Sequence, residues 1–110
     1  MKHEEKKVCY LSGAITSDPD YRERFYKVEE KYLALGYEVI NPVRIDDESG
    51  VDLTDWKWSN YMARDINILL NSNIDTIVML PTWKQSKGAC IELYNATMIL
   101  ESNVIYEKGE

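Results

Sequence analysis

Carboxylates, hydroxyls and backbone groups are the parts of this chain that could do chemistry, because its one histidine, His3, lies in a polar N-terminal stretch. A single histidine excludes histidine triads and histidine-rich zinc sites. Cys9 and Cys90 fall within apolar patterns and do not have the spacing of a metal-binding pair. We therefore expect two buried, reduced thiols and no metal.

Glu92 is the carboxylate whose position is most informative. It follows Ser86 and Gly88 near the start of a predicted helix, and helical side chains lean toward the N-terminus of their own helix. Glu92 is therefore expected over Gly88, where the missing side chain leaves room for a pocket. The helix N-terminus also favours an ionised carboxylate. Such a group could be a nucleophile, and the alternative is a solvated glutamate on a helix flank.

Two further residues could assist this glutamate. Asp65 could serve as a second carboxylate, and Tyr10 as a phenol that hydrogen-bonds a carboxylate across a crevice. Their simpler roles are an exposed ion pair and core packing, respectively. Loop residues could hold a ligand through hydroxyls, amides or a stacking ring; these are Ser12, Gly13, Thr16, Trp83, Ser86 and Gly88. Ser86 is also a natural helix N-cap.

The elements that must position these residues alternate between strand and helix. Short apolar runs predict strands over 7–11, 37–40, 76–80 and 103–106. Apolar stripes of helical spacing predict helices over 20–35, from after Asp55 to about 72, and over 88–101. This alternation predicts an α/β fold with a parallel sheet covered on both faces. Ligands bind beyond the carboxyl ends of such strands, which indicates the loops 12–19, 41–54 and 81–88.

Composition excludes several classes of protein. The length of 110 residues suits one domain, which we expect to span residues 1–110. A net charge of −6 argues against a nucleic-acid partner. No apolar run approaches the roughly 18 residues of a membrane span, and the N-terminus lacks a signal-peptide core. We therefore expect a cytoplasmic protein with no membrane partner.

Two groups of residues have simpler interpretations than a functional site. The acidic run at 46–48 does not have the spacing of an EF-hand, so a solvated polar loop over 43–54 is expected there rather than a cation site. Trp56 and Trp58 are expected to cover the seam between helix and sheet or a subunit contact. Exposed tryptophans on a small sheet favour self-association, with a homodimer as the expected state.

Four segments, in order, resemble the nucleoside 2-deoxyribosyltransferase superfamily. They are VCYLSGAIT at 8–16, GYEVINP at 36–42, YMARDI at 61–66 and LPTWKQSKGACIE at 80–92. The resemblance extends from residue 8 to about 106 and is strongest to the small bacterial and phage members, which are related to 2′-deoxynucleoside 5′-phosphate N-hydrolases. It implies a three-layer flavodoxin-like (Rossmann-like) fold with a parallel sheet of about four strands.

The same resemblance implies cleavage or transfer at the N-glycosidic bond of a (deoxy)nucleoside or its 5′-monophosphate, without a cofactor. Residues matching Glu92, Asp65 and Tyr10 would form the glycosyl-enzyme, assist departure of the base and orient the nucleophile. Residues matching Ser12, Gly13, Ser86 and Gly88 hold the 5′-phosphate in the hydrolase branch. The first loop lacks that branch's arginine, which motivates the alternative of a module that binds or sequesters a nucleotide without turnover. A purely structural subunit is a third hypothesis.

Overall fold

Four parallel strands form the sheet of this protein, in the order β2-β1-β3-β4. The structure is a computed structural model that describes residues 6–108, so His3 lies outside the described residues. The strands are β1 (Val8–Ser12), β2 (Glu38–Ile40), β3 (Thr76–Met79) and β4 (Asn103–Tyr106). The predicted α/β class and the four-stranded parallel sheet are confirmed. Strand β2 lies beside β1 at one edge of the sheet, and β4 lies beside β3 at the other edge. The direction in which the chain adds strands therefore reverses between β1 and β3.

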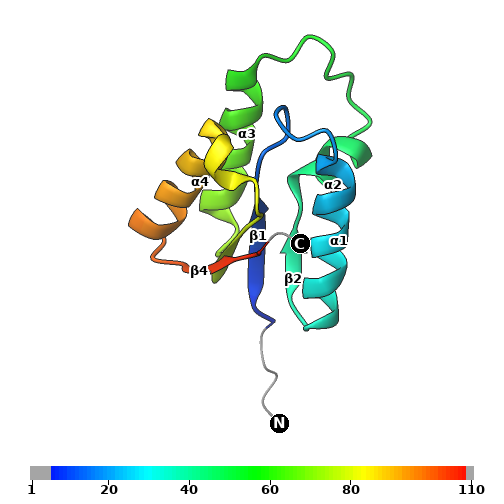
Figure 1. Cartoon of the computed structure of the whole chain (residues 1–110). Coiled ribbons are helices and arrows are strands. Elements are labelled where there is room, and N and C mark those ends of the chain that lie inside the picture. The colour runs from blue at the N-terminus through cyan, green and yellow to red at the C-terminus, as the bar shows by residue number, and fades with distance from the viewer. Residues whose placement is uncertain (1–5, 109–110) are drawn as a thin grey trace.

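Helices cover both faces of the sheet and make three layers, consistent with a flavodoxin-like fold (Figure 1). On one face lie α1 (Tyr21–Ala34) and α2 (Pro42–Glu48), and on the other lie α3 (Trp58–Asn71) and α4 (Lys87–Met98). A short 3₁₀ turn, η1 (Trp83–Gln85), precedes α4. Within the described part of the chain, no helix has the length and apolar character to cross a membrane.

The two faces of the central strands supply two hydrophobic cores. Successive side chains of a strand point to opposite faces. Cys9 and Leu11 of β1 therefore pack toward α1 and α2, whereas Tyr10 packs toward α3 and α4. In β3, Val78 belongs to the first core and Ile77 to the second. Burial on both faces explains why these strands read as continuous apolar runs.

Helix α2 contradicts the prediction of a polar loop over 43–54. Asn41 caps this helix, because its side-chain oxygen accepts a hydrogen bond from the Val43 N–H at 3.0 Å. Pro42 occupies the first turn, where no amide donor is needed. The Asn-Pro pair indicated the end of a strand, but the same pair also starts a helix. A helix of seven residues is too short to show a periodic apolar pattern.

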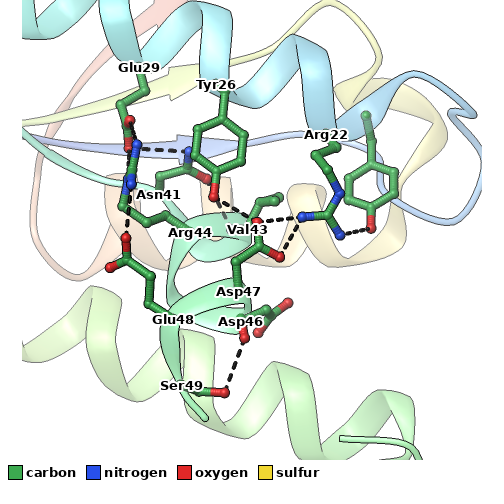
Figure 2. A network of polar contacts seen from close by, with 11 residues as sticks. Arg22, Tyr26, Glu29, Asn41, Val43, Arg44, Asp46, Asp47, Glu48 and Ser49 are labelled. Atoms are coloured by element: carbon green, nitrogen blue, oxygen red, sulfur yellow. Dashed lines mark hydrogen bonds and ion pairs between the residues drawn. The ribbon is translucent and has the colours of Figure 1, made fainter.

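The acidic run at 46–48 is correspondingly not a solvated loop. Figure 2 shows Asp47 accepting hydrogen bonds from Arg22 and Tyr26 of α1. Asp46 lies on another side of α2, with its Oδ1 atom 2.5 Å from Nη1 of Arg64 in α3. Ion pairs therefore connect α2 to α1 on the same face of the sheet and to α3 on the opposite face.

Two smaller predictions have opposite outcomes. Gly36 ends α1 as predicted, with a φ of 93° that favours glycine. Cys90, expected to be buried, is instead exposed, because it lies on the outward face of α4; Cys9 is buried as expected. Both cysteines are free thiols.

Candidate functional site

A cavity of about 290 Å³ lies beside the carboxyl ends of β1, β2 and β3. Parallel sheets bind ligands at this edge, near the point where the strand order reverses, which here lies between β1 and β3. All three loops predicted to form the site contribute to its lining. Of the predicted site residues, those in the lining are Gly13, Thr16, Asp65, Ser86, Gly88 and Glu92.

Glu92 is held in the cavity wall by two donors from β1. Its side chain is buried, with 6% exposed. The Tyr10 hydroxyl donates to Oε2 at 2.8 Å, and the Ser12 hydroxyl donates to Oε1 at 2.5 Å. Tyr10 and Ser12 are two residues apart on one strand, so their side chains point to the same face. Both carboxylate oxygens of Glu92 are thereby fixed in orientation.

The same surroundings change the acidity of Glu92. Burial, together with the charge of Asp65, raises the pKa of Glu92 to about 7, against the opposing effect of the hydrogen bonds from Ser12 and Tyr10. Burial also holds the pKa of Tyr10 well above its usual value, so the phenol remains a proton donor to the carboxylate. Near neutral pH, Glu92 therefore exists in both its neutral and its ionised forms.

Asp65 supplies the second carboxyl group of the cavity. It lies on α3 and is 8% exposed, which excludes the exposed ion pair considered from the sequence. Arg64 donates to its Oδ1 atom from Nη2 at 2.8 Å. Burial raises the pKa of Asp65, and this effect outweighs the opposing influence of Arg64; the nearby Asp46 also raises it. The cavity thus brings Glu92 and Asp65 together from two different helices.

Asp46 is a third carboxyl group in the lining, and sequence reasoning missed it. Its Oδ1 atom is buried and lies within ion-pair distance of Arg64, yet without the angles of a hydrogen bond. The signal that could have found it is the Asn41-Pro42 helix start. That start makes residue 46 part of a helix at the carboxyl edge of the sheet, rather than part of a loop.

Two glycines allow the cavity walls to come close. A Cβ atom on Gly88 would lie 3.0 Å from Sδ of Met62, so its absence lets the start of α4 approach α3. A Cβ atom on Gly13 would lie 2.8 Å from Cβ of Leu80, so the first loop packs directly on the end of β3. Ser86 caps α4 as predicted, because its hydroxyl oxygen accepts the Ala89 N–H at 3.0 Å.

The tryptophan in the described cavity lining is not the one that the sequence indicated. Trp83 is absent from the lining that the structure describes. The 3₁₀ turn places it against the core beside Tyr106, with ring centroids 5.6 Å apart. Trp58, assigned to a seam or a subunit contact, lines the cavity from the start of α3. Trp58 is 51% exposed.

A second hollow, of about 530 Å³, lies along α1 near Pro81 and is larger. Its polar lining consists of charged side chains of both signs, such as Lys31 and Glu107, which form an ion pair at 2.9 Å. Glu92 and Asp65 do not contribute to its lining. Because buried carboxyl groups with raised pKa values mark functional clefts, the smaller cavity is the candidate site.

The sequence comparison connects this arrangement to a family. The chain matches a family described as a domain of unknown function, DUF4406, over residues 7–106. No curated protein matches the chain significantly. The family match includes the three strand-following loops and all the candidate residues described above. The chain therefore belongs to the DUF4406 family.

Proposed function

We propose that this protein cleaves or transfers at the N-glycosidic bond of a (deoxy)nucleoside or (deoxy)nucleotide, with Glu92 as the nucleophile. The observation that supports this most is a buried glutamate whose two oxygens accept hydrogen bonds from Tyr10 and Ser12 while its side chain lines a ligand-sized cavity. A second buried carboxyl group, that of Asp65, lines the same cavity. Two carboxyl groups flanking a sugar are the minimum for glycoside chemistry.

In the proposed first step, an ionised Glu92 oxygen forms a bond to C1′ of the sugar as the bond from C1′ to the base nitrogen breaks. The electron pair of the broken bond goes to the base, which takes a proton from Asp65 in its neutral form. In the second step, water or another base attacks C1′, breaks the bond from C1′ to Glu92 and so releases the Glu92 carboxylate, and gives its proton to the now ionised Asp65. Two successive inversions retain the configuration at C1′.

The electrostatics of the cavity suit both roles. The transition state for breaking an N-glycosidic bond carries positive charge on the sugar. A carboxylate removed from water interacts more strongly with that charge than an exposed one does. The raised pKa of Asp65 favours the neutral form that can donate a proton. The cavity volume of about 290 Å³ is close to the lower end, about 300 Å³, of the range for small-molecule pockets.

A panel of deoxynucleosides and their 5′-monophosphates tests the proposal. Chromatography should detect free base with the parent protein and none above background with Glu92→Ala or Glu92→Gln. Glu30→Ala, which removes an exposed glutamate on α1, is the matched control and should retain activity. Mass spectrometry of acid-quenched protein should detect one added deoxyribosyl group, and only when Glu92 is present.

Undiminished base release by Glu92→Ala would overturn the nucleophile assignment. Binding measured by calorimetry without any release of base would instead favour the module that binds without turnover.

The compartment and assembly state are part of the same proposal. The free thiols of Cys9 and Cys90 suit a reducing compartment, so we keep the cytoplasm as the proposed location. A homodimer remains the proposed assembly. Tyr94, Met98 and Ile99 at the outer end of α4 are more than half exposed and supply an apolar surface for it.

A further inference from the structure

The lining of the candidate cavity is acidic and otherwise uncharged. Three of its residues carry carboxyl groups: Asp46, Asp65 and Glu92. The remaining lining residues are apolar, aromatic or hydroxyl-bearing, and within residues 6–108 the lining includes no lysine or arginine. A ligand that enters this cavity therefore meets carboxyl groups and no cationic side chain of the described lining.

The guanidinium closest to these carboxyl groups is already shared between two of them. Arg64 Nη2 donates to Asp65 at 2.8 Å, and its Nη1 lies 2.5 Å from Asp46. Even when Asp65 is in its neutral form, the positive charge of Arg64 is paired with Asp46, so little of it remains to attract an anionic ligand. Glu92 has no cationic partner among its hydrogen bonds, since its donors are the hydroxyls of Tyr10 and Ser12.

Cations at the rim of the cavity have other contacts. The Arg22 guanidinium touches the Tyr21 hydroxyl but forms its ion pair with Asp47. Lys87 places its ammonium 5.4 Å from the ring centroid of Trp58, which is the position of a cation–π contact. The contact of Lys87 is thus with an aromatic ring rather than with a carboxylate.

Two of the neutral groups that could bind a phosphate are also engaged. The Ser12 hydroxyl donates to Glu92, and the Ser86 oxygen accepts from the backbone of Ala89. The N-terminus of α4 contributes the equivalent of about half a positive charge. That is less than the full negative charge of ionised Glu92, which remains after Arg64 is paired with Asp46.

We propose that the cavity takes an uncharged (deoxy)nucleoside in preference to its 5′-monophosphate; this inference rests on the proposed function. A phosphate monoester carries a charge of about −1.5 to −2 at neutral pH. In a cavity this small, the phosphate would lie close to three carboxyl groups, whereas a 5′-hydroxyl carries no charge to be repelled. Asp46 is the residue that sets this preference, because it adds a negative charge without a role in the bond-breaking step.

The test compares kcat/KM for a deoxynucleoside and its own 5′-monophosphate, with the same base and sugar. The parent protein should prefer the nucleoside at least tenfold. Asp46→Asn should reduce that preference several-fold, because it removes one negative charge and frees part of Arg64. Asp47→Asn is the matched control: it makes the same change at the next residue, whose side chain points to α1 rather than into the cavity (Figure 2).

The possible results separate this inference from the proposed function. Equal or faster cleavage of the monophosphate would overturn the inference and leave N-glycosidic cleavage intact. If neither compound is cleaved, the proposed function fails, and calorimetry with the same two compounds then decides the charge preference. Tighter binding of the nucleoside would support the inference. Equal or tighter binding of the monophosphate, or no binding of either compound, would overturn it.

Discussion

Replacing Glu92 by glutamine should abolish base release and, at alkaline pH, stabilise the fold. The pKa of this carboxyl group rises from 4.5 to about 7 on folding. At about 1.4 kcal/mol for each tenfold change in a proton equilibrium, ionising Glu92 in the fold costs about 3 kcal/mol more than in the unfolded chain. Because the folded state holds this proton more tightly, the stability of the parent protein falls as pH rises from 4.5 through about 7.

The variant has no ionisable group at this position, so its stability does not show this decrease with rising pH. The difference in unfolding free energy between Glu92→Gln and the parent should change by about 3 kcal/mol in favour of the variant between pH 4.5 and pH 8. In a chain of this length, that change corresponds to a melting temperature higher by about 10 °C. Glutamine keeps the shape of the side chain, and the hydroxyls of Tyr10 and Ser12 can reorient to accept from its amide.

Glu29→Gln is the matched control, since Glu29 is also buried, with 4% exposed. The hydrogen bond from Arg44, whose Nε lies 2.9 Å from Glu29 Oε1, is the main cause that lowers the pKa of Glu29. Its ionised form therefore stabilises the fold above the unfolded pKa, and this stabilisation is lost as pH falls through the folded pKa. Glu29→Gln should thus be less stable than the parent by an amount that levels off about one pH unit above the unfolded pKa of 4.5 and stays constant at higher pH, unlike the difference for Glu92→Gln.

Urea unfolding of the parent and both variants at half-unit steps from pH 4.5 to 8.5 gives the three stability profiles. A difference between Glu92→Gln and the parent that stays constant over this range would refute the placement of Glu92 in a water-poor wall. If Glu92→Gln loses base release but gains no stability at alkaline pH, the catalytic role of Glu92 stands and the raised pKa is refuted.

Three further predictions follow from individual contacts. Base release should increase with pH as Glu92 ionises, with a midpoint at about 7, and should be lost where Asp65 gives up the proton that it donates. Tyr10→Phe should move the Glu92 midpoint up by about one pH unit by removing a charge-assisted hydrogen bond; a rate profile against pH measures these effects. Gly13→Ala should destabilise the fold by about 1–3 kcal/mol in urea unfolding, because its Cβ would lie 2.8 Å from Cβ of Leu80. Gel filtration at several concentrations should detect a dimer that Tyr94→Asp dissociates, whereas a monomer at every concentration would contradict self-association.

Much of the fold was predictable because its signals are local. A strand buried on both faces is continuously apolar, as in Thr76–Met79, and a covering helix repeats its apolar residues with helical spacing. Alternation of the two then requires a parallel sheet with helices on both faces. The positions of the loops at the carboxyl edge follow from that topology alone, which is why Gly13, Ser86 and Gly88 could be expected near one another.

The short helix α2 is an element that local sequence patterns could not predict. Seven residues are too few for a period to appear, and the Asn41-Pro42 pair is compatible with both a turn and a helix start. The sequence could not choose between them without knowing that Asp46 and Asp47 would meet Arg64 and Arg22. Those ion pairs join separate helices, so they exist only once the sheet has brought the helices together.

The sequence by itself determined the class of fold, the edge of the sheet that carries the site and the approach of Glu92 to Gly88, because each depends on one strand or one helix. Only the tertiary structure decided that Ser12 joins Tyr10 on Glu92, and that Asp46 and Trp58, rather than Trp83, line the cavity. These outcomes depend on how α4 lies on β1 and where the turn after β3 points. Such relations are set by packing between segments far apart in the chain, for which no local pattern exists.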